Sequence, residues 1–149
     1  FDLNIFFQWS YGNDVLNVNR IVYENPSGRN TTNRFASYVN RWTEDNPTST
    51  LPPANAVGPE VYSSLYVEDG SYLKLKNISL GYTLPANTLR ALRISTARVY
   101  VSAENIATFT SYSGPDPEVS TRHSVLTPGF DWSAYPRSFN ASLGVNVTF

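Results

Sequence analysis

The stretch Ser138–Phe149, SFNASLGVNVTF, decides the fold because its side chains alternate between two kinds. From Phe139 onward every second residue is apolar, and the residues between are small or polar. The apolar row is Phe139, Ala141, Leu143, Val145, Val147 and Phe149. Because successive side chains of a strand point to opposite faces, this alternation predicts a strand over residues 138–149 with one apolar and one polar face.

Three further segments alternate in a similar way and predict strands. They cover about residues 1–10, 71–84 and 94–108. In the first, FDLNIFFQW, Phe6 is an exception because it falls among the polar positions. In the second, SYLKLKNISLGYTLP, strict alternation places Tyr72 and Tyr82 on one face. The chain is therefore predicted to be all-β.

The predicted strands are joined by a long, a short and a second long connection, at about residues 11–70, 85–93 and 109–137. Structureless loops of that length are uncommon in compact soluble domains. Outer-membrane barrels combine short periplasmic turns with longer extracellular loops. The order predicts a transmembrane antiparallel β-barrel, with residues 11–70 and 109–137 as extracellular loops and residues 85–93 as a periplasmic turn.

The first long loop is predicted to hold a helix within RNTTNRFASYVNRWTEDNP. Apolar side chains recur there at positions i, i+3, i+4 and i+7, namely Phe35, Tyr38, Val39 and Trp42. Thr31 or Thr32 is expected to cap its start, and residues 45–47 to end it. The stripe is expected to pack onto the loop; a direct ligand contact is the alternative.

Two pairs of aromatic residues, Tyr72 with Tyr82 and Phe139 with Phe149, are each ten residues apart. Ten residues at a rise of about 3.3 Å span about 33 Å, and a tilt near 45° leaves about 23 Å along the membrane normal. The apolar band of an outer-membrane barrel is about 25 Å tall and is bounded by aromatic girdles. We therefore predict these residues to be girdle residues in outer-membrane lipid; a half-buried soluble sheet is the alternative.

The composition excludes several classes of function. The 149 residues carry a net charge of -1, which provides no basic surface for nucleic acid. Cysteine is absent and His123 is the single histidine, so disulfides, thiol nucleophiles and His-rich metal sites are excluded. The sequence contains no run of about 18 apolar residues, so it predicts no membrane-spanning helix. A mean hydropathy of -0.30 remains compatible with a barrel, whose apolar residues alternate with polar ones.

The sequence predicts neither enzymatic activity nor a cofactor, because no catalytic constellation is found. His123 lies in STRHSVLTP, where an exposed loop histidine is the simpler interpretation. Asp116 and Glu118 flank Pro117 and offer oxygen ligands for a hard cation such as Ca²⁺. Turn chemistry explains the same residues, so they are weak metal candidates and no metal site is predicted.

Two groups of residues are candidate contacts for a substrate or a partner. On the polar face of the third strand, toward a water-filled lumen, lie Arg98, Tyr100 and Glu104. The long loops contribute Trp42, Tyr112, Trp132, Tyr135 and Arg137. Aromatic rings stack on sugars, and charged side chains hydrogen-bond to hydroxyl or peptide groups. Contact with a partner protein, or packing of the loops on one another, would use the same residues.

Several motifs occur in the order in which a known family carries them. They are YLKLKNISLGYTLP, LRALRISTARVYVSAENIATFTSYSGPDPE and TPGFDWSAYPRSFNASLGVNVTF. These segments resemble the carboxy-terminal barrel region of the SusC/RagA family of TonB-dependent outer-membrane transporters. Upstream, RFASYVNRWTEDNPTSTLPPA resembles the family's helix-bearing outer loop. The resemblance covers nearly the whole chain.

The resemblance implies a barrel of about 22 strands that is occluded by an amino-terminal plug, with this chain supplying about the last four strands. It implies a SusD-like surface lipoprotein that closes over the barrel mouth. It also implies import of oligosaccharides or peptides, driven by the TonB complex through the plug. The chain is then expected in the bacterial outer membrane, beside the remainder of the same transporter.

Two other functions remain open from the sequence. A soluble β-rich carbohydrate-binding module would also show alternating strands, and it would stay folded without detergent. A passive porin-type barrel would share the lipid-facing pattern but would lack a plug and a TonB box. The sequence does not decide between a glycan and a peptide as substrate.

Overall fold

The computed structural model describes residues 1–25, 33–54, 62–90, 93–122 and 124–149. The chain folds into two compact units. Unit 1 comprises Phe1–Tyr11, Ser71–Ser111 and Pro136–Phe149, and unit 2 comprises Gly12–Gly70 and Tyr112–Tyr135. Both segments of unit 2 are thus insertions between strands of unit 1.

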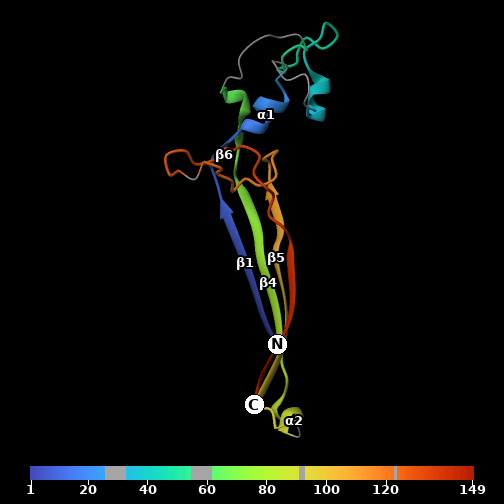
Figure 1. The fold of residues 1–149 in the computed structure, drawn as a ribbon, viewed down its shortest axis with the longest axis vertical. Coiled ribbons are helices and arrows are strands. Elements are labelled where there is room, and N and C mark those ends of the chain that lie inside the picture. Colours follow the sequence, from blue (N-terminus) through green and yellow to red (C-terminus); the bar gives the residue numbers. More distant parts are fainter. Residues whose placement is uncertain (26–32, 55–61, 91–92, 123) are drawn as a thin grey trace. The chain divides into compact units, whose positions relative to one another are not determined.

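Unit 1 is a four-stranded antiparallel sheet with the strand order β1-β4-β5-β7. The strands are β1 (Asp2–Ser10), β4 (Tyr72–Thr83), β5 (Thr96–Thr110) and β7 (Asn140–Thr148). In Figure 1, β1, β4 and β5 lie side by side, and both chain ends lie toward the end of the sheet that carries the short helix α2 (Ala86–Leu89). Within the described residues, β1 and β7 are the edges of this sheet.

The sheet has two chemically different faces, because residues paired across antiparallel strands share a face. One row of paired residues runs through Leu3, Leu80, Val101 and Leu143. Their exposed fractions are 62%, 43%, 47% and 77%, so this apolar face is uncovered. The neighbouring row consists of Asn4, Ser79, Ser102 and Ser142 and lies on the opposite, polar face. The protein is therefore mostly β. Its longest strands form a sheet with one apolar and one polar face, as their alternation predicts.

The alternation of β4 changes sides at Lys76. Leu75 pairs with Phe7 of β1, and Asn77 pairs with the adjacent Phe6, so Lys76 is an extra residue in β4. A one-residue bulge moves every following side chain to the other face. Leu73 and Leu75, which strict alternation would put on the polar face, therefore lie on the apolar face.

This bulge shows that the prediction of Tyr72 as a girdle residue is wrong. Tyr72 lies on the polar face, where its hydroxyl accepts a hydrogen bond from Gln8 Nε2 at 3.1 Å. Tyr82 lies on the apolar face and stacks on Phe1, with ring centroids 4.5 Å apart. The two tyrosines are on opposite faces because the period of two is interrupted between them.

A second irregularity lies in β5 at Asn105, whose φ of 53° is in the left-handed region. Asparagine visits this region more readily than other non-glycine residues. Between Ala107 and Glu104, β5 has one residue more than the segment of β4 with which it pairs. Asn105 Nδ2 donates a hydrogen bond to the Ser138 carbonyl oxygen at 3.0 Å. The irregularity thus ties β5 to the chain just before β7.

Unit 2 contains a small sheet where the sequence predicts only loops. Its strands β2 (Asp14–Asn17), β3 (Val67–Asp69) and β6 (Phe130–Asp131) have the order β3-β2-β6, with β2 and β6 parallel. Helix α1 (Val18–Tyr23) follows β2, and η2 (Ser64–Tyr66) precedes β3. The core cluster comprises Val18, Ile21, Val22, Tyr66 and Phe130. Strands of two to four residues are too short to produce a recognisable alternation.

The helix predicted around residues 33–45 is much shorter in the structure. Only the 3₁₀ helix η1 (Ala36–Asn40) forms, and Val39 is 78% exposed. With three residues per turn, the i, i+3, i+4, i+7 residues no longer form one stripe. Thr31 and Thr32, the predicted caps, lie outside the described residues. Among the described residues, no helix is both long and apolar enough to cross a membrane.

Candidate functional site

A belt of side chains crosses the polar face of unit 1. Arg98 of β5 passes over Gly81 of β4 and forms an ion pair with Asp2 of β1, with Nε 3.2 Å from Asp2 Oδ1. A Cβ at Gly81 would collide with both side chains. Glycine thus provides the space through which the guanidinium reaches two strands away.

Tyr100 extends this belt to the fourth strand. Its ring lies over Gly144 of β7, where a Cβ would collide with the ring. The Arg98 guanidinium carbon is 5.3 Å from the Tyr100 ring centroid, within the range of a cation–π contact. The structure therefore brings together Arg98 and Tyr100, two of the predicted polar-face residues. Glu104 lies on the same face, paired with Asn77 and Asn140.

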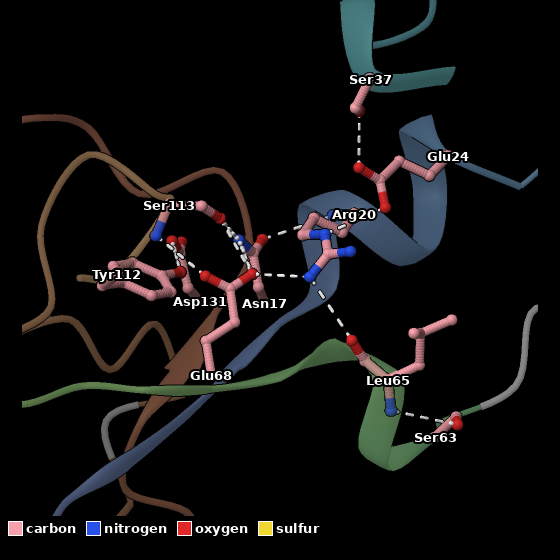
Figure 2. Close-up of polar contacts among 10 residues, drawn as sticks. All are labelled: Asn17, Arg20, Glu24, Ser37, Ser63, Leu65, Glu68, Tyr112, Ser113 and Asp131. Carbon is pink, nitrogen blue, oxygen red and sulfur yellow. Dashed lines mark hydrogen bonds and ion pairs between the residues drawn. The ribbon is translucent and has the colours of Figure 1, made fainter. Parts of the chain in front are cut away.

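Unit 2 holds a second polar cluster, which is centred on Arg20 of α1 (Figure 2). Arg20 Nε donates to Glu24 Oε2 at 2.9 Å, and Arg20 Nη1 donates to Glu68 Oε1 at 3.0 Å. Asn17, the cap of α1, donates from Nδ2 to Glu68 Oε1 at 3.2 Å. Ser113 donates to Glu68 from its backbone nitrogen at 2.8 Å and from Oγ at 2.9 Å. Arg20 thus links α1 to β3, and Glu68 links both to the segment after β5.

The electrostatics of this Arg20 cluster favour the charged forms. Burial by itself raises the pKa of Glu68, but hydrogen bonds from Ser113 and Arg20 outweigh it, so the pKa lies below its usual value. Burial lowers the pKa of Arg20, but Glu68 and Glu24 outweigh it and raise the pKa above its usual value. One arginine and two glutamates give the cluster a formal charge of about -1 at neutral pH.

Tyr112, a predicted substrate contact, is instead buried, with 6% of its surface exposed. Its hydroxyl donates to Asp131 Oδ2 at 2.6 Å, and Asp131 is 0% exposed. Burial, and next the hydrogen bond to Asp131, raise the pKa of Tyr112. The pair joins the segment after β5 to β6 and stabilises unit 2, so Tyr112 is not positioned to touch a ligand.

Two cavities adjoin the Arg20 cluster. The larger has a volume of about 820 Å³ and is lined by residues that include Asn17, Tyr23, Phe35 and Glu68. The smaller has a volume of about 390 Å³ and is lined by residues that include Asn40, Asn46 and Thr48. Both volumes lie in the range of roughly 300–1,000 Å³ that is usual for ligand sites.

The remaining predicted loop contacts lie outside these cavities. Trp42, Trp132 and Tyr135 are 40%, 50% and 90% exposed, and none of them is among the described residues that line either cavity. Arg137 is exposed and belongs to unit 1. The cavities are therefore built from side chains other than the predicted ones.

The weak metal candidates form a turn. Asp116 is 8% exposed, and its Oδ1 accepts a hydrogen bond from the Glu118 backbone nitrogen at 2.9 Å. Within the described part of the chain, no group of three acidic or histidine side chains is arranged to hold a metal ion. His123 lies outside the described residues. The hydrogen bond supports the turn interpretation of Asp116.

Sequence reasoning missed Arg20, Glu24 and Glu68. The one local signal is the spacing of Arg20 and Glu24, which are four residues apart behind Asn17 as a possible cap. Glu68 is 48 residues from Arg20, so no local pattern connects them. Only the folded unit brings these three residues together.

No family model matches the chain. The chain is 40% identical over 154 residues to TonB-dependent receptor P3 of Formosa agariphila, an alignment that covers 100% of the chain and 15% of that receptor. It is 30% identical over 91 residues to the TonB-dependent receptor SusC of Bacteroides thetaiotaomicron, covering 58% of the chain and 8% of SusC.

A solved structure of the RagAB peptide transporter matches 99% of the chain and 16% of its own chain, with a TM-score of 0.83 and 30% identity. This is a SusC/RagA-like chain. As a SusC/RagA-type chain it is located in the bacterial outer membrane, and its mostly β fold matches the barrel region of such a transporter. It spans about 15% of the length of the curated relatives P3 and P26 that it matches. The similar proteins are named as receptors and transporters rather than enzymes.

Proposed function

We propose that this SusC/RagA-type chain forms neighbouring strands of a closed transmembrane barrel of about 22 strands in a nutrient importer. The observation that carries the proposal is the uncovered apolar face of β1, β4, β5 and β7, backed by a polar face. A sheet with such a face is soluble only if another layer covers it, whereas lipid solvates it directly. This favours a barrel over a soluble carbohydrate-binding module. The edges β1 and β7 then pair with the remaining barrel strands.

In this proposal the two ends of the strands lie on opposite sides of the outer membrane. One end of the sheet holds the end of β1, the start of β4, the end of β5 and the start of β7. In the sequence, both segments of unit 2 connect strands at this end. Residues 11–70 and 109–137 are extracellular, and residues 85–93, with α2, form a periplasmic turn. Short periplasmic turns and long outer loops support this orientation. The girdle then includes Tyr82, Phe139 and Phe149.

The proposed importer carries oligosaccharides or peptides through the lumen and does no covalent chemistry on them. Its proposed partners are a SusD-like lipoprotein over the mouth and the TonB complex, which acts through a plug elsewhere in the receptor. The support is the similarity to SusC and to a structure named as the RagAB peptide transporter. Arg98, Tyr100 and Glu104 face the proposed lumen, where they contact the passing substrate or the plug.

The orientation is tested by labelling single cysteines in a receptor that carries no other cysteine; these 149 residues contribute none of their own. Val125→Cys lies in unit 2 at a side chain that is 95% exposed, and Asn87→Cys lies in α2. On intact cells, a membrane-impermeant maleimide is expected to label Val125→Cys, and Asn87→Cys only after the outer membrane is permeabilised. The reverse order, or equal labelling, contradicts the proposed orientation.

Energy dependence separates an importer from a passive porin-type barrel. Uptake of the native nutrient by cells that express the receptor is expected to stop when TonB is deleted or a protonophore is added. Uptake that persists unchanged under both treatments would identify a passive pore.

A further inference from the structure

The two cavities of unit 2 share one wall. Arg20, Glu24 and Ser37 line both the larger and the smaller cavity. Ser37 Oγ donates to Glu24 Oε1 at 2.7 Å, and Glu24 is held from its other oxygen by Arg20 (Figure 2). The two cavities are therefore separated by a single row of three hydrogen-bonded side chains.

The larger cavity combines aromatic rings with hydrogen-bonding groups. Tyr23 and Phe35 lie against one another with ring centroids 5.2 Å apart, and both line the cavity. Phe35 is 41% exposed, so part of its ring is open to a ligand. Asn19, Ser113 and Ser133 add amide and hydroxyl groups to the same walls. An aromatic surface edged with such groups suits the C–H faces and hydroxyls of a sugar ring.

The smaller cavity is lined mainly by hydroxyl and amide side chains. Apart from the shared wall and Leu51, its lining consists of Asn40, Asn46, Thr48, Ser49 and Thr50. Each of these side chains can both donate and accept a hydrogen bond. Sugar hydroxyls have the same double capacity, so a second sugar unit fits the chemistry of this cavity.

Charge argues against an anionic ligand. The positive charge of Arg20 is already matched by Glu24 and Glu68, which leaves the walls with a formal charge of about -1. Within the described residues, Arg20 uses Nε and Nη1 for its hydrogen bonds, so Nη2 remains available as a donor to a neutral oxygen. A carboxylate or sulfate ligand would instead meet Glu24 and Glu68 in the larger cavity and Glu24 in the smaller one.

From this arrangement we infer that the two cavities are adjoining subsites for a neutral oligosaccharide of at least two sugar units. One unit stacks on Phe35 in the larger cavity, and the next lies among the hydroxyl and amide groups of the smaller cavity. The shared wall of Arg20, Glu24 and Ser37 hydrogen-bonds to both units. This inference rests on the proposed function, which it deepens by assigning a substrate class and a binding site to unit 2.

The test is a printed array of neutral oligosaccharides, acidic oligosaccharides, monosaccharides and peptides, probed with the detergent-purified receptor that contains this chain. The receptor is expected to bind neutral oligosaccharides, with monosaccharides held at least tenfold more weakly. Phe35→Ala is expected to weaken binding about tenfold, which corresponds to ~1.4 kcal/mol. The double variant Thr48→Val and Thr50→Val, which keeps side-chain volume, is expected to weaken binding of longer glycans several-fold.

Two exposed apolar residues serve as matched controls. Val39→Ala lies in η1 close to Phe35 in sequence, and Leu126→Ala shortens a side chain of unit 2 that is 88% exposed; neither residue lines a cavity among the described residues. Both controls are expected to bind as the wild type does. The inference is overturned by a receptor that binds no neutral oligosaccharide, by binding confined to acidic glycans or peptides, or by neutral-glycan binding that both sets of cavity variants leave unchanged. The proposed function is tested separately, by cysteine labelling and TonB dependence. Failure of the subsite inference is therefore distinguishable from failure of the proposed function.

Discussion

Each residue of β7 faces one of two unlike surroundings. Leu143 lies on the apolar face, is 77% exposed and pairs with Val101, whereas its neighbour Ser142 pairs with Ser102 on the polar face. In the proposed barrel, the difference between lipid and water therefore falls between adjacent residues. It can be measured by placing the same charged side chain at each position.

Leu143→Arg is expected to destabilise the receptor by about 2–4 kcal/mol if the residue lies near the bilayer midplane. Ser142→Arg should cost much less, because its side chain reaches the aqueous side. Ser142 is a suitable control because it pairs with the uncharged Ser102. The measurement is the urea midpoint of folding into lipid vesicles. Equal losses at both positions would contradict the assigned faces.

A second residue-scale prediction concerns Tyr112 and Asp131. Tyr112→Phe removes the hydroxyl donor and leaves the fully buried Asp131 carboxylate short of a partner. Such a loss costs about 1–3 kcal/mol, so unit 2 should open more readily around residues 112–135. Limited proteolysis of the intact receptor measures this opening. Tyr135→Phe, at a side chain that is 90% exposed, is the control and should be cleaved as the wild type is.

At the scale of elements, α1, β3 and the segment after β5 are held together by one charged cluster. Arg20, Glu68 and Ser113 supply the contacts between them, and Glu68 accepts from both of the others. The strength of this junction depends on the ionised form of Glu68, because a neutral carboxyl loses much of its attraction to the guanidinium.

The pH dependence of the junction follows from the lowered pKa of Glu68. A carboxyl whose folded pKa is lowered contributes stability above its unfolded pKa of about 4.3, and this contribution is lost as the pH falls through the folded value. Unit 2 should therefore resist proteolysis unchanged from pH 8 to about pH 5 and become sensitive below about pH 4. Glu68→Gln should be sensitive already at neutral pH. A variant whose sensitivity matches that of the wild type at every pH would contradict this role.

The same scale explains what the sequence can and cannot predict. The long strands β1, β4, β5 and β7 could be predicted because their side chains alternate between an apolar and a polar face over many residues. Lys76 could not be recognised as a bulge, because an inserted residue alters only the phase of the pattern, and Tyr72 was assigned to the wrong face as a result. The Arg20 cluster could not be predicted as a whole, because Glu24 lies four residues from Arg20 but Glu68 is 48 residues away and is brought to it only by folding.

At the scale of the whole molecule, we propose that unit 1 lies in the outer membrane with lipid on one face and water on the other. Its apolar face is uncovered, and its edges β1 and β7 are unpaired within the described residues. Both features are costly in water and are resolved together when the sheet continues into a closed barrel.

The most direct test is a scan of spin labels along residues 141–147 of the receptor in lipid vesicles, one cysteine at a time. Collision with oxygen, which concentrates in lipid, is compared at each position with collision with a water-soluble nickel chelate. We expect oxygen accessibility at 141, 143, 145 and 147, and nickel accessibility at 142 and 146; Gly144 is left out of the scan because a Cβ there would collide with the Tyr100 ring. Equal accessibility at odd and even positions, or nickel accessibility at all of them, would contradict it.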